Sequence, residues 1–278
     1  MFFRKKKKID IENQEVEVVN EPFNTYGLSD LLHFIKREIG VDLFPKKAII
    51  ETRIRLFCEE KNINSFRKLF DEIQYNKEMK QDLVNLLTVN ETYFYRELIQ
   101  LQEAIEFAKT REGVDVLCAP CASGEEVYTI SMMFEEDLTF KKRFNIIGID
   151  INSEAIQKAK NGIYNARSLH KLSDNLKEKY FTLVSDKYQI KKEKFLYLDF
   201  SQINVFDDKF LSFGKFDIIF SRNMLIYFDE EFRVKAMQKF SKLLKDGGRI
   251  YLGHADIVPE NEYLQKHGFG SSCYYTKK

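Results

Sequence analysis

The 278-residue chain contains few of the residues that mark several common classes of protein. Only 12 glycines and 4 prolines are present, which excludes a collagen-like or linker-rich chain. No apolar run approaches the ~18–20 residues that span a bilayer, and the basic N-terminus lacks the apolar stretch and small-residue cleavage site of a secretory signal. With no export signal, the four cysteines are expected to be thiols rather than disulfides. We therefore expect a cytoplasmic protein.

The sequence also lacks an excess of either charge. Lys and Arg together number 44 and Asp and Glu 43, for a formal net charge of +1. This balance argues against a nucleic-acid partner and against an acidic disordered chain. Hydrophobic residues make up 44% of the chain, enough for a globular core, and the length suggests about two domains. The composition indicates a mixed α and β protein, so its function has to be sought in motifs.

The first 88 residues divide into a charged tail and a helical region. Residues 1–20 include a basic run, 4–8, and are expected to be a solvated, poorly ordered tail, with contact to anionic lipid or an acidic partner as the alternative. Residues 21–88 contain four short helical patterns, with Gly40 as a stop and Ser65 as a cap. Short connections between these patterns predict a small helical bundle.

From residue 114 onward, apolar strand patterns alternate with helical ones. Strands are expected at 114–118, 144–150, 195–198, 216–220 and 249–252. Ser153 and Asp229 are the expected N-caps of two intervening helices, which Gly162 and the pair Gly247-Gly248 end. The alternation predicts a mainly parallel sheet covered by helices on both faces, with ligands at the carboxyl ends of its strands.

One polar, Lys-rich segment, residues 163–193, interrupts this alternation. Residues 180–184 and 188–190 are expected to form short antiparallel strands within it. The segment is therefore interpreted as a small subdomain inserted between the second and third strands.

The loop after the first expected strand, residues 119–124, is the candidate small-molecule site. It contains a single glycine, so it is neither a GxGxxG motif nor a P-loop. Glu125 and Glu126 follow in the first helical turn, where they would repel a pyrophosphate. Asp150 ends the second strand, where an acid can accept hydrogen bonds from ribose, although a role in capping the next helix is the alternative. A ribose-bearing, positively charged ligand without phosphates indicates S-adenosylmethionine.

Two further segments have polar groups suited to a site. Residues 90–96 join the helical region to the sheet region, and either face a cleft or join two domains through their aromatic rings. Residues 221–229 follow the fourth expected strand and include Asn223 and Tyr227. Cys118 and Cys121 form a CxxC pair without a second pair, and the four histidines are scattered, so no metal site is expected.

These segments, in this order, resemble the CheR family, the chemotaxis receptor glutamate O-methyltransferases. Residues 90–96 (NETYFYR) resemble the family's Asn-Glu-Thr-x-Phe-Phe-Arg, and residues 121–126 (CASGEE) its adenosylmethionine loop, with Val127 where Pro is usual. Residues 216–229 and 248–254 resemble its fourth-strand and fifth-strand segments. The resemblance covers roughly residues 25–278.

The resemblance implies an α/β fold: a Rossmann-like S-adenosylmethionine-dependent methyltransferase sheet with an N-terminal helical domain and a small inserted β-subdomain. We accordingly divide the chain into a helical domain at 21–88, a linker segment with the NETYFYR motif and a helix at 89–110, and a methyltransferase domain at 111–278. The implied reaction moves a methyl group from S-adenosylmethionine to receptor glutamates, giving methyl esters and S-adenosylhomocysteine, without a metal.

Matched motifs imply roles for particular residues. Arg96 and Tyr227 match the reacting centre. The implied cofactor contacts are Asn90, Thr92, Arg96, Glu126, Asp150, Asn204, Val205, Asn223 and Met224. The family's Arg-rich second helix, which is thought to bind acidic receptor helices, corresponds here to Lys46, Lys47, Arg53 and Arg55.

The implied partner is the cytoplasmic helical domain of chemoreceptors. Residues 183–187 lack the Gly-rich loop of members that dock on a receptor's C-terminal pentapeptide, so this tether is expected not to be used. The sequence gives less support to two other functions. A binding module without turnover is disfavoured because Arg96, Asp150 and Tyr227 are retained. A nicotinamide-dependent oxidoreductase is disfavoured because the loop lacks the glycines of a GxGxxG motif and is followed by Glu125 and Glu126.

Overall fold

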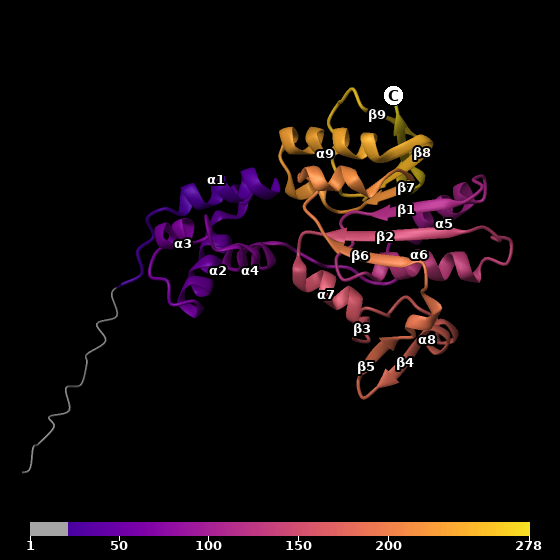
Figure 1. Ribbon diagram of the computed structural model, residues 1–278, viewed down its shortest axis with the longest axis horizontal. Helices are drawn as coiled ribbons and strands as arrows, with labels where there is room; N and C mark the ends of the chain where they lie inside the picture. The colour runs from indigo at the N-terminus through magenta and orange to yellow at the C-terminus, as the bar shows by residue number, and fades with distance from the viewer. Residues whose placement is uncertain (1–21) are drawn as a thin grey trace, which may run out of the picture.

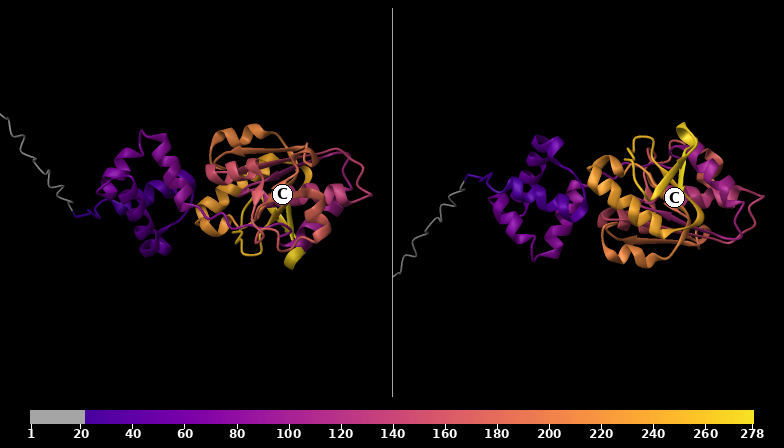
Figure 2. Two further views of the ribbon diagram at one scale, coloured as in Figure 1. Left: turned by 90° about the horizontal axis from the view of Figure 1, so that it is seen from below. Right: turned by 90° about the horizontal axis from the view of Figure 1, so that it is seen from above.

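The computed structural model describes residues 22–278, which form a helical lobe and a larger sheet lobe (Figures 1 and 2). The expected tail at 1–20 lies outside the described residues. The helical lobe contains a short 3-10 turn, η1 (Phe44–Lys46), and four helices: α1 (Leu28–Ile39), α2 (Lys47–Glu60), α3 (Phe66–Glu72) and α4 (Lys77–Leu87).

The helical lobe has its own apolar core. Leu31, Ile35, Ile54, Phe66 and Leu83 have no exposed surface and belong to one cluster. Helices of 7 to 14 residues are marginal in isolation, so packing on this cluster stabilises them. The predicted helix ends are confirmed here: Gly40 adopts a left-handed conformation after α1, and the Ser65 side chain accepts a hydrogen bond from the Lys68 amide.

The sheet lobe is built on seven strands in the order β6-β2-β1-β7-β8-β10-β9. The first five positions pair in parallel, and β10 pairs antiparallel with both β8 and β9. The strands are β1 (Val114–Cys118), β2 (Phe144–Asp150), β6 (Leu198–Gln202), β7 (Phe216–Ser221), β8 (Leu244–Leu252), β9 (Leu264–His267) and β10 (Tyr274–Lys277). The predicted mainly parallel sheet is confirmed, whereas β9 and β10 were not predicted.

Helices cover both faces of this sheet. One face packs on α5 (Leu98–Ala108), α6 (Glu125–Glu136) and α7 (Ser153–Asn161), and the other on α9 (Glu230–Leu243) and η3 (Asp208–Phe213). The strands supply alternate residues to the two clusters: Val116 lies in the first and Leu117 in the second. Both neighbours are fully buried because the strand is central, which explains its unbroken apolar run.

Three expected boundaries were wrong. The third strand was expected at 195–198 but β6 begins at Leu198, opposite Ile146 of β2, while Phe195 packs in the sheet lobe's apolar core. Helix α9 ends at Leu243, before the glycine pair, which lies inside β8 where its pairing with β7 is irregular. Helix α7 is capped by the Asn152 side chain, which accepts from the Ala155 amide, and not by Ser153.

The insertion forms the expected small subdomain. Strands β4 (Phe181–Val184) and β5 (Lys187–Ile190) pair antiparallel, and β3 (Ile163–Tyr164) adds a third strand beside β5. Helix α8 (Asp174–Tyr180) precedes this hairpin. The subdomain projects from the side of the sheet lobe (Figure 1).

Polar contacts join the two lobes at the carboxyl edge of the sheet. Lys36 of α1 forms an ion pair of 2.7 Å with Asp229, the N-cap of α9. The Asp42 amide donates to the Tyr227 carbonyl, and the Gln81 amide side chain donates to the Ile151 carbonyl. These contacts fix α1, the segment after it and α4 against the carboxyl ends of the strands. A ligand site is expected at this edge of the sheet.

Candidate functional site

A cavity of about 340 Å³ lies between the helical lobe and the carboxyl ends of β1, β2 and β7. Its walls come from the end of α1, the segment after α4, the loop after β1 and the segment after β7. Every residue expected to bind the cofactor or to act at the reacting centre lines this cavity: Asn90, Thr92, Arg96, Glu126, Asp150, Asn204, Val205, Asn223, Met224 and Tyr227. The motifs found far apart in the sequence therefore meet at one place.

Asp150 shapes the loop that forms the cavity floor. One carboxylate oxygen accepts a hydrogen bond from the Ala122 amide and the other from the Asn152 amide, both at 2.8 Å. Burial raises the pKa of Asp150, and these backbone donors oppose that rise. Each oxygen accepts one backbone hydrogen bond and keeps lone-pair capacity for a ligand hydroxyl. The alternative of a helix-capping role is wrong, because Asn152 caps α7.

The single glycine of this loop is required by its surroundings. Gly124 has a φ of +90°, and an added Cβ would lie 2.8 Å from the Cβ of Ala159 on α7. Both the left-handed backbone and the close approach of α7 therefore favour glycine. The loop turns tightly enough for α6 to begin at once with Glu125.

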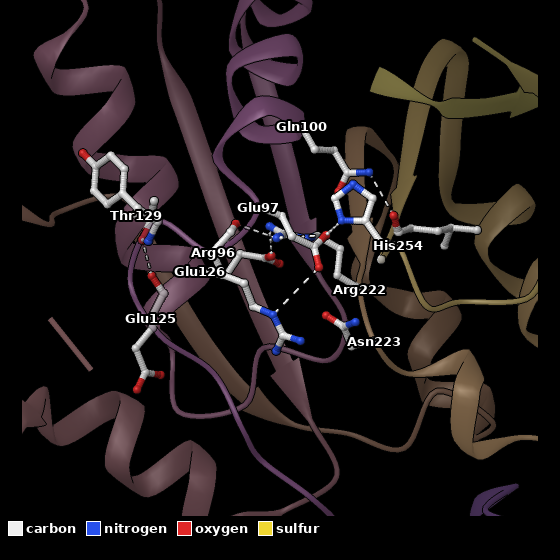
Figure 3. A network of polar contacts seen from close by, with 12 residues as sticks. Arg96, Glu97, Gln100, Glu125, Glu126, Thr129, Arg222, Asn223 and His254 are labelled. Atoms are coloured by element: carbon white, nitrogen blue, oxygen red, sulfur yellow. Dashed lines mark hydrogen bonds and ion pairs between the residues drawn. The ribbon is translucent and has the colours of Figure 1, made fainter. Parts of the chain in front are cut away.

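The two glutamates that begin α6 have different environments. Glu126 lines the cavity, whereas the Glu125 side chain points away from it (Figure 3). The Glu125 carboxylate accepts from the Ser123 hydroxyl at 2.7 Å and from the Ser168 hydroxyl at 3.4 Å. Of the two glutamates, only Glu126, the one expected to contact the cofactor, therefore faces the cavity. Glu125 lines a separate groove beside the inserted segment, together with Lys158 and Arg167.

Glu126 is paired with Arg222, a residue to which the sequence analysis gave no role. Their closest side-chain atoms are 2.6 Å apart, and the Arg222 side chain is 3% exposed. Burial raises the pKa of Glu126, and the charge of Arg222 opposes that rise. Arg222 also donates to the Arg96 carbonyl at 2.5 Å and lies 3.4 Å from Glu97 (Figure 3). An arginine directly after a strand as apolar as β7 was the signal that could have indicated a buried ion pair.

Arg96 and Tyr227 reach the cavity from the segment before α5 and the segment after β7. The Arg96 guanidinium donates to the Glu91 carbonyl at 2.8 Å and lies over the Tyr93 ring. Burial raises the pKa of Tyr227, an effect that the positive charge of Arg96 opposes. Tyr227 therefore keeps its proton near neutral pH, so its hydroxyl can donate a hydrogen bond.

Asp256 is a second residue that the sequence analysis missed. Its carboxylate accepts from the amides of Asn223 at 2.7 Å, Gly253 at 2.8 Å and Ile226 at 3.3 Å. Asn223 has a φ of +60°, and a Cβ on Gly253 would lie 2.6 Å from its amide nitrogen. These contacts hold the segment after β7 in the conformation that brings Asn223, Met224 and Tyr227 to the cavity.

Asn204 and Val205 reach the cavity from the turn after β6. The Asn204 side chain donates to the Glu38 carbonyl of α1 at 2.7 Å and accepts from the Phe206 amide. The Asn204 side chain thus joins the two lobes and also shapes its own turn. The buried Val205 contributes an apolar part of the cavity wall.

The four basic residues expected to contact a substrate lie outside the cavity, on η1 and α2. Lys46 and Lys47 are exposed. Arg55 is also exposed and forms an ion pair with Glu59 at 3.3 Å, whereas Arg53 donates to the Leu86 carbonyl of α4. Arg53 is therefore engaged within the helical lobe and is less available to a partner than the two lysines.

The CxxC pair is part of the core. Cys118 and Cys121 are buried free thiols, and burial raises the pKa of both. A high thiol pKa leaves little thiolate, the reactive form, so the pair is unsuited to redox chemistry. Among residues 22–278, no cluster of three or more His, Cys, Asp or Glu side chains could hold a metal ion.

The cavity lies at the carboxyl edge of a sheet that ends in the antiparallel strands β10 and β9, and the family model for this part of the chain identifies an S-adenosylmethionine-dependent methyltransferase. Family models describe the parts further: the all-alpha domain of CheR methyltransferases matches residues 27–88, and their SAM-binding domain matches residues 90–272. The chain belongs to the CheR methyltransferase family.

Individual relatives agree with this assignment. A chemotaxis protein methyltransferase from Campylobacter jejuni (strain 81-176) is 42% identical over 252 residues, which cover 90% of this chain and 95% of that protein. A chemotaxis protein methyltransferase from Borreliella burgdorferi is 32% identical, covering 86% and 90%. One from Escherichia coli (strain K12) is 31% identical, covering 69% and 68%. The similarity to the first two extends over most of both chains.

Proposed function

We propose that this protein transfers the methyl group of S-adenosylmethionine to glutamate side chains of chemoreceptors, the methyl-accepting chemotaxis proteins. The products are glutamyl methyl esters, which serve sensory adaptation, and S-adenosylhomocysteine. The observation that carries the proposal is the single cavity that gathers all the matched motif residues at the carboxyl edge of the sheet. Membership of the CheR family and the relatives named as chemotaxis protein methyltransferases support the same activity.

Two carboxylates are assigned to the cofactor. Asp150 accepts hydrogen bonds from the ribose hydroxyls, because it lies at the end of β2 and retains free lone pairs. Glu126 binds the amino group of the methionine portion, because it is the acidic side chain at the start of α6 that faces the cavity. Asn90, Thr92 and Met224 complete the pocket, which needs no metal.

The chemistry is a direct displacement. A carboxylate oxygen of the substrate glutamate attacks the methyl carbon in line, the new C–O bond forms as the C–S bond breaks, and the electron pair of that bond stays on sulfur. The nucleophile is already ionised near pH 7, because an ordinary glutamate has a pKa of ~4.3, so no general base is required. What the protein supplies is orientation and the exclusion of water.

Arg96 and Tyr227 are assigned to the orientation of that carboxylate. Both line the cavity, and each carries a hydrogen-bond donor suited to a carboxylate oxygen. The Arg96 guanidinium has further N–H groups beyond the one engaged by Glu91. Together they would hold the nucleophile in line with the sulfur–methyl bond.

Substrate recognition is assigned to the exposed basic residues at the start of α2. Lys46 and Lys47 follow shortly after Val41, which lines the cavity, and Asp42, whose amide bonds to the Tyr227 carbonyl. They would attract the acidic helices of the receptor's cytoplasmic domain, together with the exposed Arg55, while Arg53 is engaged with the Leu86 carbonyl. This substrate places the enzyme in the cytoplasm. Within residues 22–278, no helix is long and apolar enough to cross a membrane.

The decisive experiment is methyl transfer from labelled S-adenosylmethionine to membranes that contain chemoreceptors. We expect label on the receptor that alkali releases as volatile methanol, because a methyl ester is base-labile and an N-methyl group is not. Receptors whose methylated glutamates are changed to alanine serve as the control. Binding of S-adenosylhomocysteine without any transfer would instead identify a non-catalytic module.

The docking mode is tested separately. We expect a peptide with a receptor's C-terminal pentapeptide not to bind the inserted subdomain, because residues 183–187 lack the Gly-rich loop of tether-binding members. Strong binding of that peptide by calorimetry would contradict tether-independent action and would leave the proposed reaction unaffected.

A further inference from the structure

The backbone on both sides of Arg96 is unusual. Tyr95 has a φ of +61° and Glu97 a φ of +54°, so two non-glycine residues in the left-handed region flank the proposed carboxylate-orienting arginine. Such conformations cost of order 1–3 kcal/mol each and persist only where surrounding contacts hold them. The contacts of this turn therefore determine where the Arg96 side chain lies.

The Glu97 carboxylate is the centre of those contacts (Figure 3). One oxygen lies 3.9 Å from the Arg96 Nε, and the other lies 3.4 Å from an Arg222 Nη and 3.2 Å from the His254 Nδ1. The side chain is 14% exposed. It thus joins groups from the Asn90–Arg96 segment, the end of β7 and the segment after β8.

Arg222 extends this arrangement to the cofactor pocket. Its buried guanidinium donates to the Arg96 carbonyl at 2.5 Å and pairs with Glu126 at 2.6 Å. Glu97 supplies the second carboxylate around that guanidinium, while it does not itself line the cavity. Glu97 can therefore affect a ligand in the cavity only through the side chains that it contacts, such as Arg96 and Arg222.

We propose that Glu97 is a positioning residue, whose carboxylate holds Arg96 at the cavity both directly and through Arg222. The inference rests on the proposed role of Arg96 in orienting the substrate carboxylate. It differs from a purely structural role, in which Glu97 would only balance the buried charge of Arg222. A positioning role requires the effect of Glu97 on turnover to depend on the Arg96 side chain.

A double-mutant cycle separates these roles. The variants are Glu97→Gln, Arg96→Ala and their combination in the full-length chain, assayed for kcat on receptor membranes and for the Kd of S-adenosylhomocysteine by calorimetry. We expect Glu97→Gln to lower kcat about 10-fold with the Kd changed less than about twofold, because the contact acts on the nucleophile and not on the cofactor. In the Arg96→Ala background, the same change should lower kcat less than about twofold further.

Glu103→Gln is the matched control. Glu103 lies on α5, the helix that Glu97 precedes, and pairs with Arg249 away from the cavity. It should leave kcat and the Kd unchanged even if it lowers the thermal midpoint. If Glu97→Gln does not yield folded protein, Glu97→Asp replaces it in the cycle, because aspartate keeps the negative charge but withdraws the carboxylate from both arginines by one methylene.

The outcomes distinguish the inference from the proposed function. Equal effects of the Glu97 change in both backgrounds would overturn the positioning role and leave the methyl transfer intact. Full activity of Arg96→Ala would overturn the role of Arg96 and the inference with it. An S-adenosylhomocysteine Kd raised more than about 10-fold by Glu97→Gln would show that the residue acts on the cofactor pocket, which also contradicts the proposal.

Discussion

Replacement of Asp150 by asparagine tests the cofactor site most directly. The two carboxylate oxygens each accept a backbone amide, from Ala122 and from Asn152, and their remaining lone pairs are assigned to ribose. An asparagine of the same shape offers only one acceptor oxygen, and its NH₂ group would face a backbone N–H. The ribose therefore loses a charge-assisted hydrogen bond, which is worth about 1.5–3 kcal/mol.

That loss corresponds to a Kd for S-adenosylhomocysteine about 10- to 150-fold higher, measured by calorimetry at neutral pH. Asp115→Asn is the control, since Asp115 pairs with Lys245 at the opposite, amino end of the strands and does not line the cavity. A change of less than about threefold in Asp150→Asn, with an unchanged thermal midpoint, would refute the assignment of Asp150 to ribose. A loss of affinity in both variants would indicate general destabilisation instead.

Three further predictions follow from particular contacts. Gly124→Ala should lower the free energy of unfolding, measured by urea titration, by about 1–3 kcal/mol more than Gly214→Ala. Both glycines have a φ near +90°, but only a Cβ at Gly124 would collide with a neighbouring side chain. Equal losses in the two variants would show that this collision does not contribute to the loss of stability. Replacing the exposed Lys46 and Lys47 together by Gln should raise the KM for receptor about 3- to 10-fold, with the S-adenosylhomocysteine Kd unchanged. The increase should be largest at low salt, because salt screens the attraction between exposed charges. An unchanged KM would show that other residues recognise the receptor. Burial raises the pKa of Asp217, but hydrogen bonds from the Asp115 amide, Lys245 and Arg111 outweigh burial and lower the pKa below its ordinary value of 3.8. The stabilisation is therefore present above pH 3.8 and is lost as the pH falls through the lowered pKa. Thermal midpoints measured from pH 6 to 3 should fall less steeply in Asp217→Asn than in the unchanged protein, and parallel curves would contradict this.

Much of the fold could be predicted because the core strands and the helix caps each leave a pattern in a short stretch of sequence. The run 114–118 is buried on both sides, so its apolar character appears directly in the sequence. Ser65 and Asp229 cap helices within three residues of their own positions. Asn152 was missed in favour of Ser153 because both are good N-caps, and only the contact between Ser153 and Asn85 of α4 settles which one caps α7.

The strands that were not predicted depend on pairing between distant segments. Strands β9 and β10 have four residues each and mixed polarity, since they close the edge of the sheet. The glycine pair at 247–248 was interpreted as a helix stop, yet it lies in β8, where a Cβ on Gly248 would meet the Asp217 carbonyl of β7 at 2.9 Å. Neither feature can be recognised without knowing the partner strand.

The same distinction applies to the site. The residues assigned to the cofactor and the reacting centre belong to motifs and were found, whereas two residues that hold them in place, Arg222 at the cavity wall and Asp256 behind it, were not. Arg222 and Asp256 act on the main chain of segments 30 to 130 residues away, so their importance is a property of the folded chain. Glu125 illustrates the same point from the other side: it is adjacent to a cavity residue in sequence, but the helix turns it to another face.

The charges that line the cavity also explain why a sulfonium cofactor suits it. Three carboxylates, Glu91, Glu126 and Asp150, face two guanidinium groups, Arg96 and Arg222, which leaves a formal charge of −1. S-adenosylmethionine carries a net charge of +1 at neutral pH and would neutralise the cavity, whereas a dinucleotide would add negative charge to it. When methyl transfer occurs, the cofactor's sulfonium and the glutamate carboxylate both become neutral. Opposite charges are therefore consumed as the bond forms, and a cavity that excludes water does not oppose this loss of charge by solvating the separated ions.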